Sequence, residues 1–460
     1  MILIDFFKGV NGSATIKNTL FIFILALVVR VTYVWFFVDI SDQLIEDQQG
    51  YKLLGENMAQ TSNFFQLTDG RHTSRTPGYP IFLAVVYTLF GESNLTLILV
   101  QIIINSLTCV VIGLIAGFIV PRGFLVAGLI SSLNLGMVVY SGMILTDILF
   151  LFFFSLFILF AFHYLKSPKK IQLFLTISLL SIATFVRPVT YFFIMLLPVL
   201  LIVWFVWRRM QPKQILYSLF VYFIPVVIAF SAIHYRNYTE YNSVSLTNQG
   251  GGHALYWVVP ATYQYSGQGS YQEGKDFSLK YLDTSIKKDL NNNHFKRDDY
   301  YMQVAKEALL ELGLLNILHA WSAGAIINLL SPSAAVAPLV RNMEHPSFYE
   351  TPGNGSVDKL FNYITNTSSL LYLSIVIIGT IVSAVFLIIS IFGLYRMIKF
   401  EWVTGQNREM VLFSLFIIIY FMAITGPIIG VKYRLPIEPI MTMFFSYALV
   451  KFRNNHTNNK

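Results

Sequence analysis

Charged residues are scarce in this sequence. Only 12% of its 460 residues are Asp, Glu, Lys or Arg, whereas 55% are hydrophobic. This composition excludes an ordinary soluble domain and predicts many membrane-spanning segments. The chain has one cysteine, Cys109, which excludes an internal disulfide and argues against a redox role.

Motifs for metal ions and nucleic acids are also lacking. The eight histidines show no His-Glu-x-x-His spacing or other ligand spacing, so we expect no metal site and no cofactor. The net charge of +8 comes from basic residues in short loops between apolar runs. Such placement is typical of cytoplasmic loops that face anionic lipid, and no nucleic-acid partner is expected.

Long apolar runs are what the sequence has in abundance. They predict an all-α polytopic membrane protein with about 10 (roughly 8–13) transmembrane helices, associated with membrane lipids. The predicted spans lie near residues 19–38, 94–120, 124–143, 145–165, 171–187, 189–207, 215–233, 370–395, 411–428 and 435–451.

The positive-inside rule gives these spans a direction. It predicts a cell (inner or plasma) membrane protein of one domain, residues 1–460, with both termini cytoplasmic. The outer face then receives a first loop, residues 39–91, and later loops with interfacial helices, residues 234–369. This topology requires that Tyr79–Phe90 and Leu312–Leu330 do not cross the membrane.

The first outer loop is rich in carboxylates and ends on Arg75-Thr76-Pro77-Gly78-Tyr79-Pro80. Because the surrounding sequence is apolar, this loop is the first place where chemistry is expected. Its acidic residues are Asp39, Asp42, Glu46, Asp47, Glu56 and Asp69.

Several basic residues break the positive-inside pattern, and one acidic residue at the outer start of a predicted helix joins them. Ionisable groups near the hydrocarbon boundary cost a few kcal/mol unless they are paired or hydrated, so they usually have a function. As a set, they predict a binding site for an anionic ligand on the outer face. They are Arg75, Asp147, Arg187, Arg236, Lys432 and Arg434.

A site suits glycosyl transfer from a polyprenyl-phosphate sugar if it has cations that bind the phosphate and a carboxylate that binds the acceptor hydroxyl. The carboxylate would remove the acceptor proton, and the phosphate leaving group would need neutralisation by Arg or Lys rather than a general acid. A single direct displacement would invert the anomeric centre.

Short segments in this order resemble the bacterial membrane glycosyltransferases of the GT-C superfamily, in the group of the protein O-mannosyltransferases and aminoarabinose transferases. The similarity extends over nearly the whole chain. The segments are Asp47-Gln48-Gln49-Gly50-Tyr51, Arg75 to Pro80, Thr146-Asp147, Val186-Arg187-Pro188, Arg236-Asn237-Tyr238, Asn248-Gln249-Gly250-Gly251 and Lys432-Tyr433-Arg434-Leu435-Pro436.

The resemblance implies a GT-C-type fold and a hexosyl- or pentosyltransferase. It implies that Asp47 is the general base, that Asp147 is a second catalytic acidic residue, and that Arg75 lies near the donor phosphate. The mannosyltransferases carry Asp-Glu where this chain has Asp47-Gln48, which argues for a general family member. The remaining residues expected to bind substrate are Tyr51, Tyr79, Arg187, Arg236, Lys432 and Arg434.

Alternatives remain open at this point. Asp42 or Glu46 are alternative bases, and Asp147 with Arg187 is alternatively a structural salt bridge. A secondary transporter or lipid flippase, or a lipid-linked polysaccharide polymerase or ligase, are alternative functions. The sequence does not distinguish a lipid, glycan or protein acceptor.

Overall fold

The computed structural model describes residues 16–39, 46–62, 71–282, 293–402, 405 and 407–457, and every regular element in these ranges is a helix. The predicted all-α class is therefore confirmed. Seven helical segments in the described ranges are long and apolar enough to cross a membrane. They are α2 (Ile16–Phe37), α6 (Asn94–Ile119), α9 (Asp147–Lys166), Pro188–Trp207 with α11 (Tyr191–Trp207), α12 (Pro212–Tyr241), Leu370–Glu401 with α21 (Leu370–Met397), and α22 (Arg408–Thr425).

Two further apolar segments are sharply bent. Helices α7 (Gly123–Leu133) and α8 (Leu135–Ser141) meet at 52°, so the span expected at 124–143 is broken into two helices rather than one straight helix. Asn134 breaks it, because its side chain accepts a hydrogen bond from the Met137 N–H at 3.0 Å and starts a new helix. With each bent pair taken as one span, the described residues hold up to nine, and the expected ten are not confirmed.

The second bent pair lies where the sequence predicts a segment that does not cross. Helices α17 (His294–Leu312) and α18 (Leu314–Leu330) meet at 103°. Gly313 joins them with a φ of 83°, a left-handed conformation that glycine adopts without strain.

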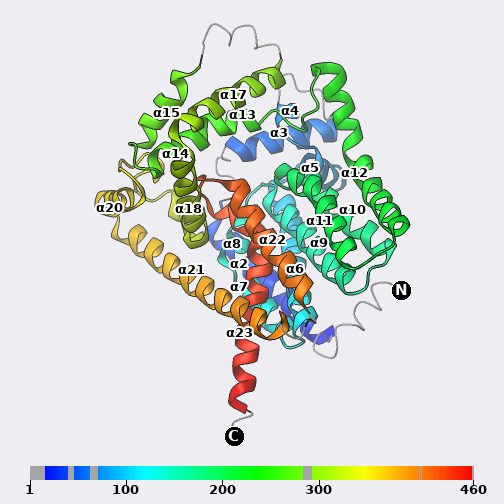
Figure 1. The fold of residues 1–460 in the computed structure, drawn as a ribbon. Helices are drawn as coiled ribbons and strands as arrows, with labels where there is room; N and C mark the ends of the chain where they lie inside the picture. The colour runs from blue at the N-terminus through cyan, green and yellow to red at the C-terminus, as the bar shows by residue number, and fades with distance from the viewer. Residues whose placement is uncertain are drawn as a thin grey trace.

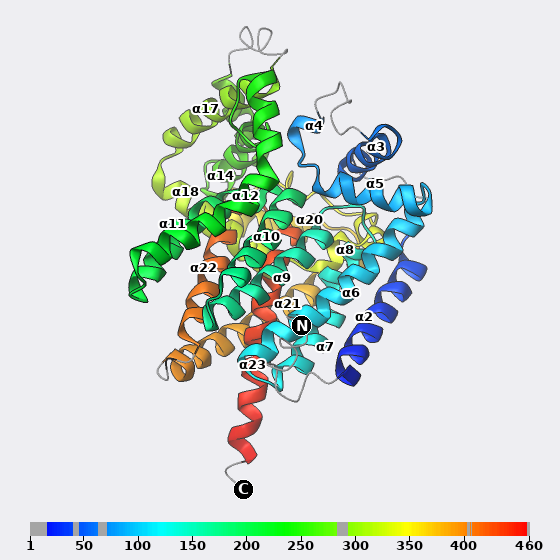
Figure 2. The ribbon, with the colours of Figure 1, turned by 90° about the vertical axis from the view of Figure 1, so that its right-hand side faces the viewer.

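The remaining helices are short or lie outside the apolar set. Helices α3, α4, α13 and α17 gather at the end of the bundle opposite to the C-terminal end of α23 (Figures 1 and 2). The bounds are α3 (Glu46–Thr61), α4 (Arg71–Ser74), α5 (Gly78–Phe90), α10 (Lys170–Val186), α13 (Gly250–His253), α14 (Val259–Tyr265), α15 (Tyr271–Lys280), α19 (Pro338–Arg341), α20 (Ser356–Asn366) and α23 (Glu438–Thr457).

A buried arginine lies within the first span. Arg30 is 0% exposed, and its guanidinium donates to the carbonyl oxygens of Ala26 and Ser132 at 3.0 and 3.2 Å and to Cys109 Sγ at 3.1 Å. Protein acceptors therefore replace the water that the cation has lost. The packing of α2 on α6 and α7 accounts for this charge.

Helix α20 presents an apolar face to the surroundings. Val357 and Phe361, one turn apart, are 84% and 65% exposed, whereas Lys359 on the other face is fully buried. The Lys359 ammonium donates to Gln264 Oε1 and lies 4.8 Å from the centre of the Phe348 ring. An exposed apolar stripe of this kind is typical of a helix that lies in the membrane interface.

Lys359 gives the fold a pH dependence. Burial lowers its pKa to about 7, whereas an unfolded lysine titrates near 10.4. Between these values the unfolded state binds the extra proton, so the free energy of unfolding should rise as the pH rises from 7 toward 10. Lys359→Met should flatten this slope, as measured by thermal unfolding in detergent at a series of pH values. Parallel slopes for the two proteins would contradict the prediction.

Candidate functional site

The loop between the first span and α5 forms an ion pair beside an aromatic ring. Asp47 Oδ1 and Arg75 Nη2 are 2.6 Å apart, and we call these two residues the loop pair. Arg75 Nη1 also donates to the Tyr51 hydroxyl at 3.4 Å, and its guanidinium lies 5.0 Å from the centre of the Tyr51 ring. Asp47 is 44% exposed in its side chain, so an incoming molecule has access to the carboxylate.

Local sequence explains this arrangement. Asp47 and Tyr51 are four residues apart on α3 and therefore share one face of the helix. Gly78 begins α5 and lies so close to the end of α10 that an added Cβ would be 2.5 Å from the Phe185 carbonyl oxygen. Only a glycine permits this approach, which holds Arg75 near the junction of α10 and α11.

A second ion pair joins two membrane helices at that junction. Asp147 is the first residue of α9, and Arg187 follows the last residue of α10. Their side chains form a salt bridge and are 4% and 17% exposed, and we call them the helix pair. Breaking such a buried pair typically costs about 3–5 kcal/mol, so the helix pair also fixes α9 against α10.

Tyr51 lies between the two ion pairs. Burial raises the pKa of its phenol, while the cations of both pairs oppose the shift and the carboxylates of both pairs add to it. The ring is therefore within the electric field of both pairs.

Gln48, on the same helix, accepts a hydrogen bond from the Ile144 N–H at 2.8 Å and ties α3 to the segment just before Asp147. The structure thus brings the expected residues Asp47, Arg75, Asp147, Arg187 and Tyr51 together.

Tyr79 supports this cluster from below the surface. It is 0% exposed, its hydroxyl donates to Gln101 Oε1 at 2.6 Å, and its ring meets the Tyr51 ring edge-on at 5.3 Å. Sequence reasoning noted Gln48 only as a departure from the Asp-Glu pattern, and it did not find Gln101, since an isolated glutamine carries no recognisable pattern.

Arg236 lies beside the segment that precedes Arg75. Its Nε donates to Asn237 Oδ1 at 2.8 Å, and its guanidinium lies 6.0 Å from the Tyr241 ring centre. The Tyr241 hydroxyl is 3.4 Å from His72 Nε2. Arg236 is thus connected to the loop through one aromatic side chain.

Lys432 and Arg434 have different surroundings although they are two residues apart. Lys432 lies 5.6 Å from the ring centre of Tyr433 and forms no ion pair with a carboxylate in the described part of the chain. Tyr433 in turn acts electrostatically on Arg187, which places this segment beside the helix pair.

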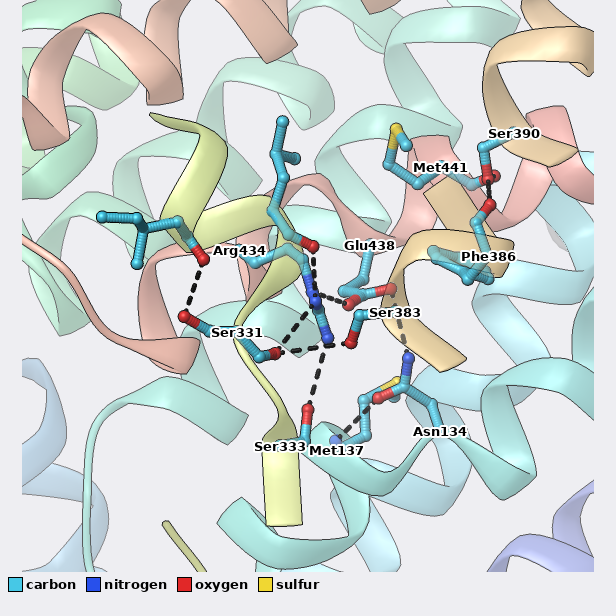
Figure 3. Close-up of polar contacts among 12 residues, drawn as sticks. Asn134, Met137, Ser331, Ser333, Ser383, Phe386, Ser390, Arg434, Glu438 and Met441 are labelled. Atoms are coloured by element: carbon cyan, nitrogen blue, oxygen red, sulfur yellow. Dashed lines mark hydrogen bonds and ion pairs between the residues drawn. The ribbon is translucent and has the colours of Figure 1, made fainter. Parts of the chain in front are cut away.

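Arg434 belongs to a buried hydrogen-bond network that contains neither the loop pair nor the helix pair (Figure 3). Its Nε donates to Glu438 Oε1 at 2.8 Å, and Nη1 donates to the Leu329 carbonyl oxygen at 2.8 Å. Asn134 Nδ2 donates to the other Glu438 oxygen at 3.1 Å. Arg434 therefore holds the start of α23 against α18 and the α7–α8 break.

Some expectations lie outside the described residues. These are Asp42 and the side chain of Glu46, the alternative bases. Among the residues that the structure describes, no group of three or more His, Cys, Asp or Glu side chains could hold a metal ion.

An apolar cavity of about 350 Å³ lies toward the far ends of the same helices, lined by residues that include Phe157, Ile177, Trp204 and Phe413. Asp147 starts α9 and Leu165 of the cavity nearly ends it, so this cavity is not part of the candidate site.

These features define a multi-pass helical membrane protein with acidic and cationic groups clustered at one end of its bundle. No family model matches the sequence, and no curated protein matches it.

The solved structures that are similar to the chain include two of one protein. The first is ArnT from Cupriavidus metallidurans in the apo state, with 13% identity and a TM-score of 0.40, covering 94% of this chain and 76% of ArnT. The second is the same protein bound to undecaprenyl phosphate, with 13% identity and a TM-score of 0.40, covering 95% of this chain and 77% of ArnT. These matches agree with the resemblance expected from the sequence. The chemistry of the site follows from this chain's own contacts.

A matched pair of glycine variants tests how the site is built. Gly78→Ala should lower stability by about 1–3 kcal/mol, because its Cβ would overlap backbone atoms of α10. Gly50→Ala should be neutral or stabilise by about 0.5–1 kcal/mol, because no atom lies within 4 Å of its added Cβ in α3. Thermal unfolding of both purified variants is the measurement, and equal midpoints would contradict the close approach of α5 to α10.

Proposed function

We propose that this protein is a membrane glycosyltransferase that moves a hexosyl or pentosyl group from a polyprenyl-phosphate carrier to an acceptor hydroxyl. The observation that carries the proposal is the joining of the loop pair and the helix pair around Tyr51 at one end of an apolar bundle. A bundle of this kind accommodates a prenyl tail beside it, and the cations suit a phosphate at its boundary.

Asp47 is the proposed general base. It takes the proton of the acceptor hydroxyl as the oxygen attacks the anomeric carbon, and the bond from that carbon to the phosphate oxygen breaks. The phosphate leaves as a stable anion, so it requires positive charge rather than a proton donor. One displacement of this type inverts the anomeric centre.

Arg75 has a double role in this proposal. In the structure its guanidinium is bound to the Asp47 carboxylate and occupies one of its oxygens. A bound donor phosphate would compete for the guanidinium and draw it from Asp47. The base would thus become available only when the donor is in place.

The helix pair acts as a positioning element. Asp147 is largely buried and bound to Arg187, so it holds the junction of α10 and α11 rather than accepting a substrate proton. Lys432, which has no carboxylate partner among the described residues, is the cation best placed to approach a second phosphate oxygen. Arg236 and Arg434 fix neighbouring segments.

We place the reaction on the outer face of a cell membrane. Lys166, Lys170 and Arg208 lie at the ends of α9, α10 and α11 that face away from the candidate site. The positive-inside rule favours the cytoplasm for that end, and therefore the outer face for Asp47 and Arg75.

Replacement of the base tests the reaction. Asp47→Asn keeps the shape of the side chain but cannot take up the acceptor proton, so transfer should fall about 10²–10⁴-fold. Mass spectrometry of lipids and glycans from membranes holding equal amounts of the two proteins would show the sugar increment only with the original residue. Unchanged transfer in a folded, inserted variant would reject Asp47 as the base, and equal profiles with and without the protein would reject the enzyme.

A second variant tests the proposed phosphate contact. Lys432→Gln should weaken donor binding about tenfold, because one charge-assisted contact to phosphate is lost. Its control is Lys213→Gln, which removes an exposed lysine at the far end of the bundle and should change nothing. Donor-concentration series give the KM for both, and equal values would remove Lys432 from the donor site.

A further inference from the structure

A second cavity, of about 290 Å³, lies between α13 and α17 at the same end of the molecule as the candidate site. Polar and aromatic side chains line it together. They include Asn248, Gln249, His253, Trp257, Arg297 and Asp298. The roles proposed above for the loop pair, the helix pair and Lys432 do not use these residues.

The glycine run of Asn248-Gln249-Gly250-Gly251 explains why the cavity exists. A Cβ on Gly251 would lie 1.8 Å from the Asp298 carbonyl oxygen, so only glycine lets α13 touch α17. The neighbouring Gly252 N–H donates to Asp298 Oδ1 at 2.9 Å and fixes the carboxylate at the cavity wall.

The next turn widens into a π-helix over Ala254–Val258, a feature that is frequent at functional sites. It carries Tyr256 and Trp257 into the lining. Tyr256 is held edge-on against Tyr301 at 5.5 Å, and Trp257 is 45% exposed. The wall therefore offers an accessible indole whose orientation is fixed by its ring contact with Tyr349 at 5.7 Å.

The lining has the chemistry of a carbohydrate site. Arg297 supplies donors, Asp298 supplies acceptors, and Gln249 supplies both, in planar arrays that suit pairs of sugar hydroxyls. The buried Oδ1 of Asn248 has no hydrogen-bond partner among the described residues, and a hydroxyl would satisfy it. An exposed aromatic face packs against the C–H face of a sugar ring. A lipid tail would leave these polar groups unpaired, and a phosphate would meet the Asp298 carboxylate.

One hydrogen bond and one electrostatic interaction connect this cavity to the candidate site. The Asn248 N–H donates to the Thr73 carbonyl oxygen at 3.1 Å, two residues before Arg75. On the other side, His253 is within the electrostatic reach of Lys432. A molecule in the cavity is thus flanked by the segment before the loop pair and by the proposed phosphate cation.

We propose that this cavity binds one sugar unit of a carbohydrate acceptor and so directs a hydroxyl of the acceptor toward Asp47. This proposal rests on the proposed function, because a sugar bound here is an acceptor only if the protein is a glycosyltransferase. Trp257 and Arg297 are specificity residues in this account, because they contact the acceptor sugar and not the reacting atoms.

Ligand-detected NMR on the full chain in lipid nanodiscs tests the proposal. The probes are the methyl glycosides of glucose, galactose, mannose and N-acetylglucosamine. At least one should give saturation transfer with the original protein, and Trp257→Ala and Arg297→Gln should weaken its binding about tenfold. Trp35→Ala, a substitution at an 80% exposed residue of α2, is the matched control and should bind equally.

The outcomes separate the two proposals. Asp47→Asn should keep glycoside binding while losing transfer, so retained transfer in that variant rejects the proposed base and leaves the cavity proposal standing. The cavity proposal would be overturned if no glycoside gave a signal or if the cavity variants bound the glycosides as well as the original protein does. It would also be overturned if these variants instead lost binding to a serine-rich peptide tested in parallel. In transfer assays the cavity variants should raise the acceptor KM and leave the donor KM unchanged, whereas a merely structural role would lower kcat with both KM values unchanged.

Discussion

The organisation of this protein depends on keeping ionised groups paired at the boundary of an apolar bundle. A carboxylate or guanidinium that loses water near hydrocarbon is costly unless a partner of opposite charge replaces the water. The helix pair meets this requirement where α9, α10 and α11 come together. The loop pair, in which Asp47 of α3 binds Arg75, meets it at a more exposed position. The difference in exposure separates a fixed pair from one that a ligand can open.

Three other buried charges have protein acceptors in place of water. Arg434 has Glu438 and two carbonyl oxygens, Arg30 has backbone acceptors and Cys109, and Lys359 has Gln264 within a shell of aromatic rings. These cations hold helices together, and each is bound by acceptors of the protein. Lys432 is only partly buried and has no carboxylate partner among the described residues, and for these reasons we assign it to the donor phosphate.

The helices and part of the candidate site could be predicted from the sequence, because the length of an apolar run and the position of a charge are visible in short segments. Long apolar runs predicted the helices. Misplaced charges directed attention to Arg75, Asp147 and Arg187, and the family resemblance directed it to Asp47. The break at Asn134 could not be predicted, because it depends on one side chain capping α8 within an otherwise apolar run. The Arg434 network joins residues up to 304 positions apart, and the cavity needs Gly251 to meet Asp298 across two helices. Such contacts exist only once the chain has folded.

The most direct test of the account is an experimental structure of the protein in nanodiscs with undecaprenyl phosphate. The account predicts the phosphate within about 4 Å of the cationic groups of Arg75 and Lys432, with the loop pair opened and the Asp47 carboxylate released. It also predicts that the helix pair stays closed. Phosphate density at the far ends of α9 and α10 beside the apolar cavity, with the loop pair intact, would contradict it.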